Sequence, residues 1–150
     1  LEEADIKDYN LLIIGDGELL NQLKNRYTAS NVKFLGFLPN EKVLEHISKC
    51  IAVVTATKLY EGHPRLLSEA SALEALSIYP SFGGMDEFFP ENYEFSFEQH
   101  NYNDLKNKFI LLTDKEVRKN SLNKVTVHTQ KLFNENIIRN KFIKVFEEHF

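Results

Sequence analysis

Short apolar runs alternate with segments of helical periodicity from residue 10 to residue 113. Apolar, β-branched runs of this length are typical of buried strands, and the amphipathic segments between them are typical of crossover helices. The alternation therefore predicts an α/β fold, a Rossmann-like parallel sheet with helices on both faces. The strands are predicted at residues 10–15, 31–36, 51–57, 77–81 and, at an edge of the sheet, 93–97. The helices are predicted at residues 18–29, from Pro39 onward, from about Pro64 onward, as one turn at 85–89, and at 102–113, 114–131 and 134–149.

Composition narrows the class of protein. The 150 residues are 43% hydrophobic, which is enough for the core of one ordinary domain. The net charge of −4 argues against a nucleic-acid groove, which needs a basic face. The single cysteine, Cys50, excludes an internal disulfide and is predicted to be a small buried apolar group.

The sequence contains no apolar run as long as a membrane span and no secretory signal. It starts at Leu1, almost directly before a predicted core strand. We therefore expect residues 1–150 to be a single domain, truncated at its N-terminus, from a longer protein.

The stretch from Leu59 to Ala72 holds the main candidate for a site. It follows the predicted strand 51–57, so the order is strand, tight loop, helix. Gly62 permits a loop geometry that a side chain would hinder, and Pro64 suits the first position of a helix. The free N–H groups at such a helix start form a pocket for an anion such as phosphate.

Two carboxylates, Glu61 and Glu69, lie on either side of this predicted helix start. A carboxylate beside a phosphate site needs a reason, because like charges repel. Recognition of sugar hydroxyls supplies one, since a carboxylate accepts two O–H donors side by side. The pattern favours a nucleotide-sugar pocket at the carboxyl end of the strand. A purely structural explanation also fits the spacing, because acidic residues are common near helix starts.

Glycine turns follow two other predicted strands, where they can let a backbone approach a ligand closely. They are Gly15-Asp16-Gly17 and Gly83-Gly84. The sequence has no G-x-G-x-x-G, so the dinucleotide-binding fingerprint is absent. Taken alone, each turn is explained as an ordinary connection.

The last predicted helix carries an apolar stripe. Ile138, Phe142 and Phe146 recur at i+4 spacing, with Phe150 one step further. A helix lying on a membrane surface is one interpretation. A stripe that packs against the core is the favoured one, because acidic residues balance the cations beside it.

Four sequence motifs occur in a specific order between roughly residues 10 and 100. They are LLIIGDGELLNQL, VKFLGFLPNEKVLEHISKCIAVV, EGHPRLLSEA and SFGGMDE. Each is weak alone, but their order and separations resemble the C-terminal, nucleotide-sugar-binding half of a retaining GT-B glycosyltransferase. The family is the large one often called group 1 or family 4.

This resemblance implies specific roles in a donor site. Glu61 would be the catalytic-centre residue that binds hydroxyls of the transferred sugar, and Glu69 would bind the ribose hydroxyls. The backbone N–H groups of His63, Arg65 and Leu66 would hold the pyrophosphate. The remaining assignments are Gly62 and Pro64 in the signature loop, Gly15 and Gly17 keeping the crevice open, Phe37 and Leu38 flanking the base, and Gly83 and Gly84 on the far wall with Glu87 supporting their turn.

The sequence departs from the family pattern after the second glutamate. Glu74 stands where a glycine usually ends the helix, and Leu76 stands where a proline usually precedes the next strand. These departures predict a longer helix and a strained turn into Ser77. The family's cations for the leaving pyrophosphate lie upstream of this chain. Arg65 is a candidate for contact with phosphate. That it is an ordinary solvent-exposed surface arginine is an equally good interpretation.

The resemblance implies that the parent protein transfers a sugar from a UDP- or GDP-sugar with retention, without a metal or other cofactor. The acceptor would be a glycan or lipid-linked molecule, bound by an N-terminal domain absent from this chain. Bacterial surface polysaccharide synthesis, such as that of lipopolysaccharide, is the expected setting. It implies a cytoplasmic protein with peripheral association at the inner face of the membrane.

Two other functions remain as alternatives. One is a nucleotide-sugar epimerase or hydrolase with the GT-B fold. The other is a degenerate, non-catalytic module for nucleotide binding or chaperoning, suggested by the departures at Glu74 and Leu76. Residues 1–150 alone are expected to be inactive and to bind nucleotide weakly.

Overall fold

The computed structural model describes residues 6–149, and it places strands and helices in the predicted order. The strands are β1 (Leu11–Ile14), β2 (Val32–Gly36), β3 (Ala52–Val54), β4 (Leu76–Ser81) and β5 (Ser96–Glu98). The helices are α1 (Leu20–Arg26), α2 (Asn40–Ile47), α3 (Arg65–Ala72), the 3-10 turn η2 (Met85–Phe88), α4 (Tyr102–Leu111), α5 (Lys115–Leu132) and α6 (Glu135–His149).

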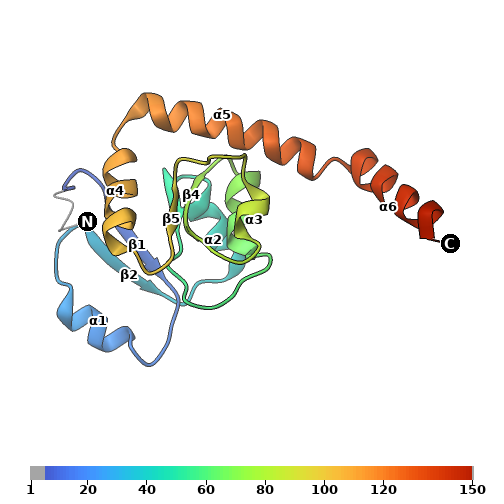
Figure 1. The fold of residues 1–150 in the computed structure, drawn as a ribbon. Helices are drawn as coiled ribbons and strands as arrows, with labels where there is room; N and C mark the ends of the chain where they lie inside the picture. Colours follow the sequence, from blue (N-terminus) through green and yellow to red (C-terminus); the bar gives the residue numbers. More distant parts are fainter. Residues whose placement is uncertain (1–5, 150) are drawn as a thin grey trace.

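All strand pairs are parallel, and helices flank them, so the predicted α/β class is confirmed (Figure 1). The helices α3 and α5 both contact β4, while α4 contacts β5. The strands form two hydrogen-bonded sets within residues 6–149, β1-β2 and β3-β4-β5. The strand β5 lies at an edge of its set, as predicted.

The core is built around β4, whose residues from Leu76 to Pro80 are buried. Leu67 of α3 and Ile78 of β4 are fully buried. Aromatic rings fill the space beyond the sheet, where Phe89 stacks between Tyr79 and Tyr93 with ring centroids 4.4 and 4.6 Å away. Large apolar side chains thus fix β4, the strand that leads into the Gly83-Gly84 turn.

Two predicted strands are shorter than expected. The strand predicted at 51–57 covers Ala52–Val54, and the strand predicted at 93–97 is shifted toward the C-terminus, to Ser96–Glu98. Tyr93 and Phe95 are nevertheless buried, because the coil that carries them packs into the core. Cys50 is half-buried against the core, where burial raises the pKa of its thiol.

The prediction of a longer third helix is wrong. Helix α3 ends at Ala72, and Glu74 adopts a positive φ of 57° in the turn that follows. The predicted strain therefore lies at Glu74, where a residue with a Cβ occupies the left-handed region. Leu76 donates its N–H to the Ile51 carbonyl at 3.4 Å, a hydrogen bond that a proline could not make.

The prediction that the last helix packs against the core is also wrong. Helix α6 projects from the α/β body beyond the end of α5 (Figure 1). Phe142 is 69% exposed, and Ile138 and Phe146 are exposed beside it. The Phe142 and Phe146 rings stack on each other at 6.3 Å, and Phe150 lies outside the described residues. Among the helices of residues 6–149, none is long and apolar enough to cross a membrane.

Candidate functional site

The loop after β3 leads into the start of α3, as the sequence predicts. Pro64 is the N-cap residue, with φ −65° and ψ 115°, and the helix begins one residue later than predicted, at Arg65. Within the described part of the chain, no side chain caps this helix start, and its first turn contains no acidic residue. The N–H groups of Arg65 and Leu66 thus point out of the helix, where an anion can accept from them.

The two predicted carboxylates lie on either side of this helix start. Glu61 is half-buried in the loop, and Glu69 is half-buried in the second turn of α3. Neither occupies the first turn, where acidic residues favour the helix dipole. The structural explanation based on that preference therefore accounts for neither position.

Glu69 forms an ion pair with Arg65. The Arg65 Nε donates to the Glu69 Oε1 at 2.7 Å, while the arginine side chain is 74% exposed. Because the pair is i,i+4 and its arginine is exposed to water, it stabilises the helix only weakly. A ligand can therefore compete for either partner at little cost.

The Gly83-Gly84 turn packs directly on the backbone of the Glu61 loop. The Gly84 N–H donates to the Glu61 carbonyl at 3.0 Å. A Cβ on Gly83 would lie 2.4 Å from the Glu61 carbonyl oxygen, and a Cβ on Gly84 would lie 2.4 Å from that of Gly62. These glycines thus hold the Glu61 loop in place, and their role as a wall of the donor crevice stays a prediction.

His63 is held by two residues that the sequence analysis did not single out. Its Nε2 lies 2.7 Å from the Ser68 Oγ on α3, and its ring packs against Phe88 of η2 at a centroid distance of 4.0 Å. Glu87 also belongs to η2, and its N–H donates to the Gly84 carbonyl at 3.2 Å. The site loop is therefore tied to α3 on one side and to η2 on the other.

An exposed aromatic pair borders the same loops. Tyr60 precedes Glu61, and its ring meets Phe82, which precedes Gly83, edge to face at 5.4 Å. Both rings are exposed to solvent. Their signal in the sequence was an aromatic residue directly before Glu61 and another directly before Gly83.

The other predicted site residues follow β1 and β2. The Gly15 N–H donates to the Gly36 carbonyl at 2.8 Å, which joins the two strand ends. A Cβ on Gly15 or Gly17 would meet no atom within 4 Å, so the space beside this turn is open among the described residues. Phe37 is exposed and Leu38 is half-buried. The predicted site thus consists of two groups, one at the ends of β3 and β4 and one at the ends of β1 and β2.

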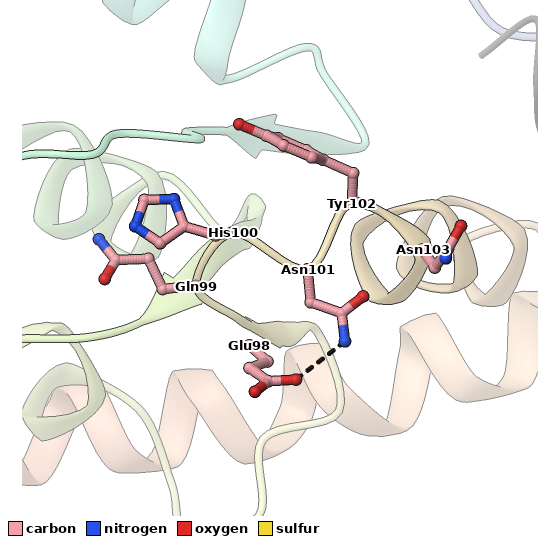
Figure 2. A pocket seen from close by; sticks show the side chains of 6 residues that line it. All are labelled: Glu98, Gln99, His100, Asn101, Tyr102 and Asn103. Atoms are coloured by element: carbon pink, nitrogen blue, oxygen red, sulfur yellow. Dashed lines mark hydrogen bonds between the residues drawn. The ribbon is translucent and has the colours of Figure 1, made fainter.

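A separate polar pocket lies where β5 leads into α4 (Figure 2). Asn101 donates its side-chain N–H to Glu98 at 2.8 Å and accepts from the Asp104 N–H at 3.0 Å. Asn101 is the N-cap of α4, so these bonds stabilise the start of that helix. The residues around this pocket include none of the predicted donor-binding positions.

The sequence matches a known protein family. Residues 1–128 match the family model described as glycosyl transferases group 1. The chain is 30% identical over 117 residues to an uncharacterized glycosyltransferase from Methanocaldococcus jannaschii. That match covers 75% of this chain and 33% of the relative, so the chain spans about a third of that protein.

Solved structures share the fold at lower sequence identity. HepE of Anabaena in complex with UDP has a TM-score of 0.77 at 17% identity, covering 97% of this chain and 43% of that one. A glycosyltransferase from Rickettsia africae has a TM-score of 0.78 at 18% identity, covering 97% and 41%. Sucrose-phosphate synthase from Thermosynechococcus elongatus has a TM-score of 0.74 at 21% identity, covering 97% and 40%. The fold is that of GT-B glycosyltransferases, and the chain belongs to the group 1 family of glycosyl transferases.

Proposed function

We propose that residues 1–150 form the donor-binding half of a family 4 enzyme that transfers a sugar from a nucleotide-sugar to an acceptor with retention of configuration. The observation that carries this proposal is the pair Glu61 and Glu69 on either side of the uncapped start of α3. The complexes of Anabaena HepE with UDP and with UDP-glucose support a nucleotide-sugar as the donor.

In this proposal the diphosphate binds at the start of α3. The backbone N–H groups of His63, Arg65 and Leu66 donate to its oxygens, and the helix dipole stabilises the charge that develops on the leaving group. This electrostatic role needs no divalent metal. The upstream part of the longer protein adds the cations that complete the neutralisation.

The two carboxylates bind hydroxyls on opposite sides of the diphosphate. Glu61 accepts from the transferred sugar, at a position fixed by the Gly84 hydrogen bond to its carbonyl. Glu69 accepts from the ribose and gives up part of its ion pair with Arg65, whose guanidinium then turns toward the phosphates. The exposure of the Arg65 side chain lets it leave the pair at little cost in free energy.

The acceptor in this proposal is a glycan or a lipid-linked glycan, bound by a separate N-terminal domain. We propose that the enzyme acts in the synthesis of a bacterial surface polysaccharide. It would work in the cytoplasm, at the inner face of the cell membrane.

The reaction is tested by giving the full-length protein UDP-glucose or GDP-mannose with and without a glycan extract, and analysing the products by NMR. We expect nucleotide release that depends on the acceptor and an α-linked product from these α-linked donors. A β-linked product would contradict retention, and an isomerised sugar formed without acceptor would indicate an epimerase instead. Glu61→Gln should abolish transfer, while Glu91→Gln, at an exposed position outside the site, should leave it unchanged.

A further inference from the structure

The loop between β3 and α3 exposes two large apolar side chains directly before Glu61. Leu59 is 71% exposed and Tyr60 is 75% exposed. The ring of Phe82, on the loop after β4, is also open to solvent and contacts the Tyr60 ring. Single exposed apolar residues are normal on a protein surface. Aromatic side chains gathered beside a polar site are typical of a surface that binds a ligand.

The two rings are held in a defined geometry although they are open to solvent. They meet edge to face, with an interplanar angle of 79°, which is an arrangement that the charge distribution of aromatic rings favours. The loops that carry Tyr60 and Phe82 are joined by the hydrogen bond from the Gly84 N–H to the Glu61 carbonyl. A ligand that covers such a preorganised surface loses less free energy to ordering of the protein.

The position of the rings indicates which part of the reaction they serve. In the proposed function, Glu61 binds the transferred sugar, and this carboxylate is half-buried. Tyr60 is next to it in the chain and more exposed, so its ring is open to a molecule that arrives from solvent. The nucleobase is expected elsewhere, beside Phe37 and Leu38 after β2. The acceptor is therefore the part of the reaction that these rings can contact.

The chemistry of the surface favours a sugar ring as its ligand. A pyranose such as glucose carries C–H bonds on its two faces and hydroxyl groups around its rim. Stacking on an aromatic ring removes the C–H face from water and leaves the hydroxyl groups hydrated. The hydrocarbon tail of a lipid fits less well, because it would remove water from the nearby Glu61 carboxylate and Tyr60 hydroxyl without replacing their hydrogen bonds.

We infer that Tyr60 and Phe82 form a stacking subsite for a pyranose ring of the acceptor glycan. The inference rests on the proposed function and deepens it, because it assigns part of acceptor recognition to the donor-binding half of the enzyme. The subsite holds the acceptor beside the sugar that Glu61 binds.

The subsite is tested by saturation-transfer NMR on the full-length protein with UDP present. The probes are methyl glycosides of glucose, galactose, mannose and N-acetylglucosamine. We expect saturation of at least one of them, strongest at the protons on one face of its ring. Sorbitol, which carries hydroxyl groups but has no ring, should receive none.

Variants at Tyr60 give the expected size of the effect. Tyr60→Ala should weaken binding of the glycoside about tenfold, and Tyr60→Phe should retain it. Tyr102→Ala is the matched control, since it removes another exposed tyrosine, from the start of α4, and should change nothing. Calorimetric titration of the same samples with UDP shows whether the variants are folded.

Glu61→Gln distinguishes the acceptor from the donor sugar. A glycoside signal that survives Glu61→Gln but not Tyr60→Ala supports the stacking subsite. Loss of the signal in both variants would place the glycoside in the donor-sugar position and would overturn the inference. Binding of none of the glycosides, or equal binding by Tyr60→Ala, would overturn it as well. Absence of UDP binding by the unmodified protein would contradict the proposed function itself, and the inference with it.

Discussion

Gly84 illustrates how closely the two loops of the site approach. Its φ of −91° suits any residue, so an added methyl group acts only through its 2.4 Å approach to the Gly62 carbonyl oxygen. We expect Gly84→Ala to lower the free energy of unfolding by about 1–3 kcal/mol, the range for overpacking. Gly62→Ala is the control, since its Cβ meets nothing within 4 Å and should change stability by less than about 0.5 kcal/mol. Urea denaturation measures both changes. If the two variants changed the free energy of unfolding equally, the contact between Gly84 and the Gly62 carbonyl would not constrain the loops.

Glu94 links the coil before β5 to helix α5. It accepts from the buried Ser121 hydroxyl at 2.7 Å and pairs with Lys124. Burial raises the pKa of the Glu94 carboxyl. The hydrogen bonds from Lys124 and Ser121 lower this pKa by more than burial raises it, so the net shift is downward. Stability from this group is therefore present above its ordinary pKa and is lost as the pH falls toward the lowered value.

We expect Glu94→Gln to lower the free energy of unfolding at pH 7 by about 1 kcal/mol. The difference from the unmodified chain should shrink as urea denaturation is repeated from pH 6 down to pH 3.5. Glu91→Gln, at an exposed position, should show no such difference at any pH. A Glu94→Gln difference that stays constant with pH would contradict the assignment.

At the scale of elements, the turn from α3 into β4 stores backbone strain at Glu74. Glycine adopts a φ of 57° without the Cβ clash, so Glu74→Gly should raise the free energy of unfolding by about 1 kcal/mol. Glu74→Ala keeps the Cβ and should leave stability nearly unchanged. Thermal unfolding of the two variants separates backbone strain from loss of the carboxylate. Both variants lose the carboxylate, so equal changes in stability would contradict the assignment of strain to the Glu74 backbone.

Helix α6 contributes little to the α/β body. Because Phe142 is exposed, Phe142→Ala should change the free energy of unfolding of this chain by less than about 0.5 kcal/mol. Phe95 is fully buried in the core, and Phe95→Ala should cost about 3–5 kcal/mol. Similar losses for the two variants would mean that α6 packs on the body after all.

Apolar runs and helical periodicity located the elements, because each pattern is a local property of the chain. The ends of the elements, such as Val54 in β3 and Ala72 in α3, depend on contacts with distant parts of the chain, which a local sequence pattern does not reveal. The stripe of α6 showed an apolar face but not what covers it. At the site, the spacing identified Glu61 and Glu69, whereas the contacts of His63 with Ser68 and Phe88 depend on how separate elements come together.

At the scale of the whole molecule, two strand pairs end in loops that carry the predicted donor-binding residues. The group 1 family and the GT-B fold account for this arrangement of parallel strands and helices. We propose that a nucleotide-sugar binds at the start of α3 between the carboxylates of Glu61 and Glu69.

Calorimetric titration of the full-length protein with UDP and with GDP tests this claim most directly. A hydrogen bond to a charged group contributes about 1.5–3 kcal/mol, so Glu69→Ala should weaken binding of the preferred nucleotide about 10- to 100-fold. Glu91→Ala should bind it as the unmodified protein does. Unchanged nucleotide affinity in Glu69→Ala would contradict the claim.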